Sequence, residues 1–298
     1  MDKSMKDAEI SAEFPFESKY LEVKGSRMHY VEDGEGDPIL FLHGQPMWSY
    51  LWRNVIPHVS NQGRCIAPDL IGMGKSDKPD IDYTFDDQYA YLEEFIERME
   101  LKNITLVIHD WGSGLGLHYA NMHSDNVKAI AFMDAMVRTV NWEDMPLGYA
   151  PMFKMIRAPF IGWLMLSVGN MFLKKVMPDL IVRKLTREET NRYMEPYPTI
   201  ASRKAIRMWP KELPISGKPE GVYKKQIAWI KNLSESQIPK LCLYMHPGGI
   251  ILEKDLDYVR NSFPNIKMVD VGEGKHFIQE DNPHGVGNAI SQWYREIK

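Results

Sequence analysis

The sequence predicts an α/β protein with a mostly parallel sheet, helices on both of its faces and a helical insertion. Short apolar runs that are typical of buried strands alternate with amphipathic helical stretches along most of the chain. This alternation stops over residues 137–217, where helical runs rich in Met, Phe, Trp and Leu are broken by prolines. We therefore expect a core domain at 1–136 and 218–298, with a helical cap domain at 137–217 inserted after the sixth strand.

Each predicted strand is a short apolar run bounded by turn residues. The first two runs alternate in polarity around Lys24-Gly25-Ser26, which indicates an antiparallel hairpin. The later runs are apolar throughout, as in strands that are covered on both faces. The eight predicted strands are 20–23, 28–31, 38–42, 64–69, 105–108, 127–133, 240–245 and 266–270. The predicted core helices are 85–99, 223–230, 253–263 and 282–298, and one more follows residue 110.

Composition narrows the functional class. A chain of 298 residues with 44% hydrophobic and 26% charged residues is an ordinary globular protein that is long enough for one large core. A net charge of −4, without a basic tract that carries aromatic residues, argues against nucleic-acid binding. The two cysteines, Cys65 and Cys242, lie in strand-like runs, so we expect buried thiols and neither a disulfide framework nor a metal site.

The N-terminal residues are charged and lack the apolar core of a signal peptide. No uncharged apolar run reaches the length of about 18 residues that a membrane span needs. From the sequence we expect a cytoplasmic protein without a membrane partner. A periplasmic location stays open, because a mature chain whose signal has been removed would look the same.

The most informative stretch runs from Thr105 to Gly114. Four apolar or β-branched residues lead into His109-Asp110-Trp111-Gly112, and a helical apolar stripe follows. This pattern predicts a strand, a tight turn and a helix, with Asp110 at the mouth of the sheet and at the N-terminus of the helix. The turn resembles the nucleophile elbow of α/β-hydrolases, with a carboxylate where serine is usual. The alternative is an acidic N-cap without a catalytic role.

Three further polar residues follow predicted strands. Gln45 follows the third strand, Asp134 follows the sixth, and His276 lies on the loop after the last strand. The carboxyl ends of parallel strands are where catalytic groups gather in such sheets. With Asp110, this gives the chain order nucleophile, acid and histidine, which is one known solution to the geometry of a catalytic triad.

Four sequence blocks together resemble the haloalkane dehalogenases. They are His43-Gly44-Gln45-Pro46 with Ser49–Asn54, then Asp69–Asp77, then His109–Gly112, and finally His276–Asp281. The similarity runs from about residue 20 to the end of the chain. Coelenterazine-using luciferases share these blocks, and they also resemble the cap stretch from Met177 to Leu185. Epoxide hydrolases share the first and third blocks, but they also need two cap tyrosines, for which Tyr149, Tyr193 and Tyr197 show no evident pairing.

The resemblance implies an α/β-hydrolase fold and hydrolysis of carbon–halogen bonds without a cofactor or metal. Asp110 would displace halide from a saturated carbon, and His276 would activate the water that opens the resulting ester. Trp111 and Gln45 would bind the halide ion through side-chain N–H groups. The partners would be a small halogenated aliphatic substrate and a halide ion, and the protein would be a monomer or a weak homodimer.

Two positions depart from the family pattern. The family usually has asparagine in the first block, where this chain has Gln45, which is one methylene longer. One subfamily has a glutamate after the sixth strand, where this chain has Asp134. A second subfamily has its acid after the seventh strand, and there this chain offers only the more distant Glu253 and Asp255. We therefore expect Asp134 to orient His276.

The cap should supply the substrate pocket. Its aromatic residues either line this pocket or form the core of the cap itself. The candidates are Trp142, Phe153, Phe160, Trp163, Phe172, Trp209 and Pro210, together with Ile250 from the loop after the seventh strand. Trp209 and Pro210 best match the family's cap residues near the halide.

Overall fold

Eight strands form a single sheet in a computed structural model that describes residues 9–145 and 148–298. The strand order is β1-β2-β4-β3-β5-β6-β7-β8, and every pairing from β4 to β8 is parallel. The strands are β1 (Lys19–Val23), β2 (Ser26–Asp33), β3 (Pro38–Leu42), β4 (Arg64–Pro68), β5 (Ile104–His109), β6 (Val127–Ala135), β7 (Lys240–Pro247) and β8 (Ile266–Gly274). The predicted fold class is confirmed, including the antiparallel hairpin of β1 and β2.

The central strand β5 explains why its sequence is continuously apolar. All six of its residues are buried, because β3 and β6 flank it and helices cover both of its faces. The edge strand β8 is only partly buried and runs to Gly274, four residues past its predicted end. A half-covered edge strand carries a weaker apolar pattern, so its end was harder to predict.

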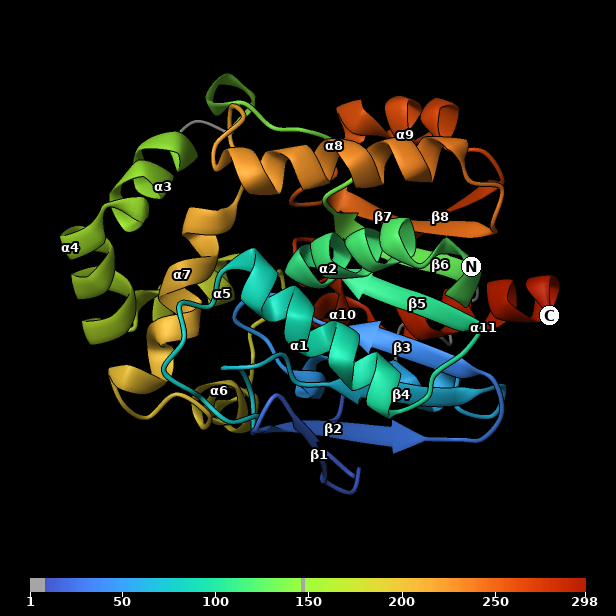
Figure 1. Ribbon diagram of the computed structural model, residues 1–298, viewed down its shortest axis with the longest axis horizontal. Helices are drawn as coiled ribbons and strands as arrows, with labels where there is room; N and C mark the ends of the chain where they lie inside the picture. Colours follow the sequence, from blue (N-terminus) through green and yellow to red (C-terminus); the bar gives the residue numbers. More distant parts are fainter. Residues whose placement is uncertain (1–8, 146–147) are drawn as a thin grey trace.

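Helices cover the two faces of the sheet. In Figure 1, α1, α2 and α8 lie on the near face, and α10 and α11 lie behind the sheet. The core helices are α1 (Phe85–Arg98), α2 (Asp110–Met122), α8 (Glu220–Glu235), α9 (Leu256–Ser262), α10 (Ile278–Asp281) and α11 (Pro283–Ile297). Helix α1 begins at a capping box in which Thr84 and Asp87 each bind the other's backbone N–H.

The segment between β6 and α8 contains the helices of the predicted cap. They are α3 (Tyr149–Arg157), α4 (Pro159–Gly162), η6 (Trp163–Val168), η7 (Phe172–Val176), α5 (Met177–Asp179), α6 (Arg187–Met194) and α7 (Lys204–Glu212). Both η6 and η7 are π-helical. The two ends of the segment meet where Val140 pairs with Ile215. The boundaries at residues 137 and 217 remain a prediction.

Among the described residues, no single helix is long and apolar enough to cross a membrane. One bent pair, Pro159–Val168 with Phe172–Asp179, meets the criteria of length and composition when its two helices are taken together, with an angle of 62° between them.

A buried ion-pair network joins the cap to the core. The guanidinium of Arg53 donates to both oxygens of Glu280, at 2.6 and 3.0 Å, and to Glu189 of the cap at 2.8 Å. Arg183 and Tyr193, both from the cap, also donate to Glu280. The side chains of Arg53 and Glu280 are fully buried. Since every member has a charged or hydroxyl partner, the network holds the cap against the core segment around Arg53.

We expect Arg53→Met to lower the free energy of unfolding by about 3–5 kcal/mol, because Glu280 and Glu189 would keep buried negative charge with one cation fewer. Urea titration followed by circular dichroism measures this loss. Arg27→Met is the matched control, because the Arg27–Asp77 pair is largely exposed and should contribute little. An equal, small loss in both variants would contradict a structural role for the network.

Candidate active site

Two aspartates lie at the carboxyl ends of neighbouring parallel strands. Asp110 directly follows β5 and begins α2, and Asp134 lies near the end of β6. Their φ angles are 48° and 43°, a left-handed conformation that is uncommon for residues other than glycine. Strained backbone of this kind persists where surrounding contacts hold it, and it often marks a functional site.

His276 lies between these two carboxylates. Its Nδ1 donates to Asp134 Oδ2 at 2.6 Å, and its Nε2 is 3.4 Å from Asp110 Oδ2. All three residues are buried. The structure thus brings together the three residues that the sequence predicts to be catalytic, although their positions in the chain span 166 residues between Asp110 and His276.

The electrostatics of this triad favour a charged pair. Burial alone would lower the pKa of His276, but its bonds to Asp110 and Asp134 outweigh burial and raise that pKa to about 10. Burial alone would raise the pKa of Asp110, but the adjacent imidazole of His276 holds it below its ordinary value. Asp110 is therefore an ionised carboxylate at neutral pH.

Backbone N–H groups fix the orientation of the Asp110 carboxylate. The Gln45 N–H donates to Asp110 Oδ1 at 2.8 Å, and the Trp111 N–H helps to hold the pKa of this carboxylate below its ordinary value. Gly44 makes this approach possible, because a Cβ at that position would lie 2.0 Å from Asp110 Oδ1. Asp110 Oδ1 thus lies in a preformed anion site, while Oδ2 faces His276.

Asp134 is held by the loop after β7. Its Oδ1 accepts N–H groups from Gly249 at 3.3 Å, from Ile250 at 2.7 Å and from Ile251 at 2.9 Å. Gly249 permits this close approach of the loop to Asp134, because a Cβ at position 249 would lie 2.4 Å from Asp134 Oδ2. The predicted pocket residue Ile250 is half-buried and contacts the site through its backbone.

The two other acids that the sequence offered for His276 lie on the turn before α9. Asp255 accepts the backbone N–H of Leu252 and forms an ion pair with Arg138 at 3.1 Å. Glu253 begins the same 3₁₀ turn. The geometry therefore places Asp134, and not the acids of this turn, against His276.

Sequence reasoning missed a role for His109. Its Nε2 lies 2.7 Å from the backbone carbonyl of His276, so this nitrogen carries the hydrogen and donates it. Burial and the nearby charge of His276 lower the pKa of His109 to about 4, so its ring is neutral. We conclude that His109 positions His276. The sequence signal that could have indicated this role is the position of His109 next to Asp110.

The cap contributes a second indole to the site. The ring of Trp209 stacks on that of Trp111, with centroids 4.4 Å apart and planes at 29°. Trp209 is fully buried, and its Nε1 has no hydrogen-bond partner among the described residues. Pro210 is also buried, within α7. A buried N–H donor without a partner, next to Trp111, is a candidate for binding an anion.

Gln45 joins the core to the cap. Its side-chain Nε2 donates to the backbone carbonyl of Ile206 in α7 at 2.5 Å. This bond uses one of its two amide hydrogens and leaves the second for another acceptor. Asparagine is one methylene shorter, so the longer side chain of Gln45 gives the reach for this contact.

Other predicted pocket residues are distributed over both sides of the cap. Phe153 is half-buried on α3, which packs against α7, the helix of Trp209. Phe160 and Trp163 are 70% and 38% exposed, so the expectation that they line the pocket or the core of the cap is wrong. The apolar pattern of their helix does not distinguish its inner face from its outer face.

The three candidates for the two cap tyrosines of an epoxide hydrolase are not paired toward Asp110. Tyr193 donates to Glu280, and Tyr197 donates to the carbonyl of Pro46 at 3.1 Å. Tyr149 is exposed. Epoxide activation by two cap tyrosines is therefore not supported by their geometry.

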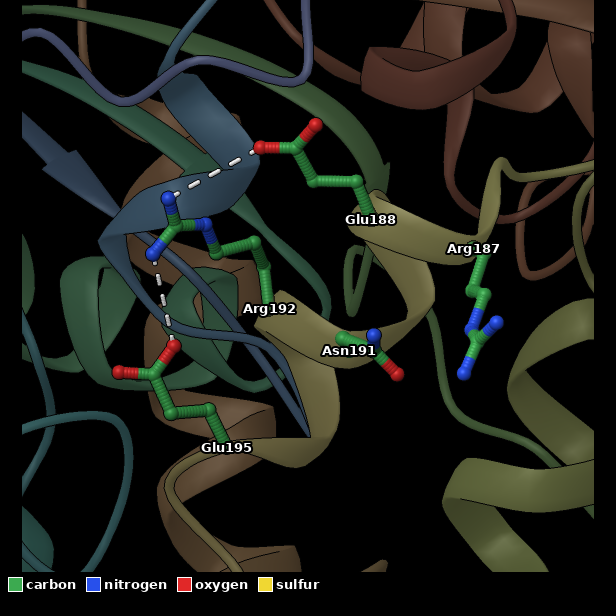
Figure 2. A pocket seen from close by; sticks show the side chains of 5 residues that line it. All are labelled: Arg187, Glu188, Asn191, Arg192 and Glu195. Atoms are coloured by element: carbon green, nitrogen blue, oxygen red, sulfur yellow. Dashed lines mark ion pairs between the residues drawn. The ribbon is translucent and has the colours of Figure 1, made fainter.

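One further group of side chains and one surface hollow have some features of a binding site. His109, Asp134 and His276 offer possible metal-ligand atoms within 4.8 Å of one another, but His276 Nδ1 and Asp134 Oδ2 already bond each other, and Asp134 Oδ1 accepts backbone N–H groups from the loop after β7. Figure 2 shows a shallow hollow along α6, where Arg192 faces Glu188 and Glu195 at 3.9 and 3.6 Å. Its charges are exposed and mutually paired, so it indicates no particular ligand.

Comparisons with known proteins agree with this geometry. The family model of the alpha/beta hydrolase fold matches residues 37–283. Curated haloalkane dehalogenases from Sphingobium indicum and Mesorhizobium japonicum are 40% and 38% identical to this chain, over 95% and 93% of its length and 97% and 91% of theirs. The crystal structure of haloalkane dehalogenase DbeA from Bradyrhizobium elkani aligns with a TM-score of 0.92 and 36% identity, covering 95% of this chain and 98% of that one.

A second solved structure, the haloalkane dehalogenase DatA from Agrobacterium tumefaciens, aligns with a TM-score of 0.91 at 33% identity, covering 95% of this chain and 97% of that one. The agreement extends through the cap as well as the sheet, since almost the whole length of each relative is covered. The chain belongs to the haloalkane dehalogenase family of the alpha/beta hydrolase fold.

Proposed function

We propose that the protein hydrolyses carbon–halogen bonds of haloalkanes to an alcohol, a halide ion and a proton, with Asp110 as nucleophile. The observation that carries this proposal is a buried, ionised carboxylate at a strained strand end, paired with a histidine that is itself held by a second carboxylate. A carboxylate is a competent nucleophile toward saturated carbon at neutral pH, and the ester that it forms can be opened by activated water.

In the first step, Asp110 Oδ2 attacks the carbon that bears the halogen, and the bonding electrons leave with the halide. The other oxygen, Oδ1, is held by the Gln45 N–H, so the carboxylate is oriented before the substrate arrives. The product is an alkyl ester of Asp110 and a halide ion. No proton moves in this step.

Three N–H donors are proposed to stabilise the departing halide. They are the indole N–H of Trp111, that of Trp209, and the second amide hydrogen of Gln45. The partnerless, fully buried Nε1 of Trp209 supports this assignment, since a buried donor needs an acceptor. Hydrogen-bond donors stabilise a developing charge more strongly in a site that excludes water than they do in water.

In the second step, His276 takes a proton from water, and the resulting hydroxide attacks the ester carbonyl of Asp110. The negative charge that develops on Oδ1 is received by the N–H groups of Gln45 and Trp111. The tetrahedral intermediate then collapses: the bond from the carbonyl carbon to the alkylated Oδ2 breaks, and the alkoxide leaves as the alcohol with the proton of the new carboxyl group. This restores the ionised Asp110 beside protonated His276.

The ester carries no charge, so His276 loses one of the two carboxylates that raise its pKa in the free enzyme. Alkylation of Asp110 therefore lowers that pKa, so His276 releases its proton to solvent, which is the proton product of the reaction, and becomes a base.

Release of bromide from 1-bromohexane and 1,2-dibromoethane, followed with a halide-selective electrode, tests the proposed function. We expect turnover by the wild type and none by Asp110→Asn, in which the nucleophile is neutral. Light emission with coelenterazine, without bromide release, would instead assign the scaffold to a luciferase. Bromide release by Asp110→Asn equal to that of the wild type would refute the role of Asp110.

We expect His276→Phe to trap the ester, because alkylation needs no base and hydrolysis does. Intact-protein mass spectrometry after incubation with 1-bromohexane should show a mass increase of one hexyl group, located on the peptide that contains Asp110. His123→Phe is the matched control, since His123 follows the far end of α2 and pairs with Glu93, and it should turn over without accumulating ester. An unmodified His276→Phe protein after long incubation would contradict this mechanism.

We expect Gln45→Met to reduce kcat/KM for 1-bromohexane by about 10- to 100-fold, as for the loss of one hydrogen bond to a charged group. Gln88→Met is the matched control, because the Gln88 amide is equally buried and donates to the Ile71 carbonyl at 2.9 Å. It should change kcat/KM by less than about threefold. Equal kcat/KM for Gln45→Met and the wild type would remove Gln45 from the halide site.

A further inference from the structure

The outer side of the cap is an exposed apolar face. Of the thirteen large hydrophobic side chains that are exposed among the described residues, seven lie between Tyr149 and Val168. Figure 1 shows α3 and α4 at the edge of the molecule that is farthest from the sheet. The residues of this outer face are Phe160, Ile161, Leu164 and Val168. Phe160 is 70% exposed and Leu164 is 49% exposed.

The helical stretch that carries this face, α4 with η6, is apolar on all of its sides. Phe160, Leu164 and Val168 recur at intervals of four residues on the exposed side. On the other side, Leu166 is fully buried against the rest of the cap. Between Pro159 and Val168 there is no charged residue, and Ser167 is the single hydroxyl. A solvent-facing helix of a globular protein normally has a polar outer side, so this composition points to an apolar environment.

The cap segment around this helix is also cationic. Between Asp144 and Asp179 the sequence has no acidic residue, whereas it contains Lys154, Arg157, Lys174 and Lys175. The chain as a whole has a net charge of −4, so this segment has the opposite sign. Lys154, Lys174 and Lys175 are exposed, and Asp179, at the end of the segment, forms a loose exposed pair with Lys175 at 3.8 Å.

We propose that this outer face of the cap docks on an anionic lipid bilayer. Phe160 and Leu164 would enter the boundary between headgroups and acyl chains, and the exposed lysines would lie among lipid phosphates. Apolar area together with cationic attraction is what holds amphipathic helices at such surfaces. The helix pair Pro159–Val168 and Phe172–Asp179 matches a membrane span in length and composition but is bent by 62°, as suits a segment that lies on a bilayer. This proposal differs from the sequence expectation of no membrane partner, which stays a prediction.

A second copy of the chain fits this face less well. A symmetric dimer brings the same patch of each subunit together. The lysines of one subunit would then lie near those of its partner, and the segment offers no acid before Asp179 to pair with them. Charge complementarity therefore favours an anionic surface over self-association. The proposal is independent of the reaction at Asp110.

Co-sedimentation of the full-length protein with vesicles tests the proposal. One set of vesicles contains phosphatidylcholine alone, and the other contains phosphatidylcholine with phosphatidylserine. We expect the wild type to bind the anionic vesicles and to bind them less as salt is raised, because surface charges are screened. Phe160→Asp and Leu164→Asp should each abolish binding. The double substitution Lys174→Gln with Lys175→Gln should weaken vesicle binding about tenfold or more, because each lysine near an anionic surface strengthens binding several-fold.

Two variants serve as matched controls. Ile227→Asp places the same charge at an exposed apolar position on α8. Lys224→Gln with Lys231→Gln removes two exposed lysines from that helix. Both should bind vesicles as the wild type does, and circular dichroism should show all variants folded. Absence of vesicle binding by the wild type, equal binding to neutral vesicles, or equal loss in the controls would each overturn the proposal. A dimer in sedimentation velocity that Phe160→Asp dissociates, without vesicle binding, would also overturn it.

Discussion

The placement of one imidazole between two carboxylates constrains most of this structure. His276 can meet both Asp110 and Asp134 only if the two aspartates end neighbouring parallel strands and turn back over the edge of the sheet. Both therefore adopt positive φ angles, and the loops opposite them need glycine at positions 44 and 249. The strain at each aspartate is held by backbone N–H groups that bind its carboxylate, so the same contacts stabilise the turn and orient the charge.

The cap completes the site through a few specific contacts with the core. Trp209 stacks on Trp111, Gln45 donates to Ile206, and the buried network around Arg53 and Glu280 fixes α6. These contacts come from three separate core segments, so they fix both the orientation of the cap and its distance from the core. This positioning matters because a hydrogen-bond donor that is displaced by even an ångström loses much of its effect on a developing charge.

The inner and outer sides of the cap show the limits of an apolar pattern. Trp209 and Phe160 are both aromatic residues of cap helices, yet one is fully buried beside the reacting groups and the other is largely exposed. A helix that is apolar on all sides gives no periodicity that would distinguish the two environments. The difference follows from which side packs against the core, and it is this difference that turns the outer face into a candidate for binding lipid.

The sequence by itself determined the fold class, placed the polar candidate residues after predicted strands, and predicted that Asp110 is a nucleophile. These follow from local patterns: continuous apolar runs for covered strands, a His-Asp-Trp-Gly turn and a proline-broken helical insertion. Only the tertiary structure decided which acid meets His276, that His109 positions it, and that Gln45 reaches Ile206. Each of these depends on the distance between side chains that lie far apart in the chain, and a difference of one methylene in length, as in Gln45 or Asp134, has meaning only once that distance is fixed.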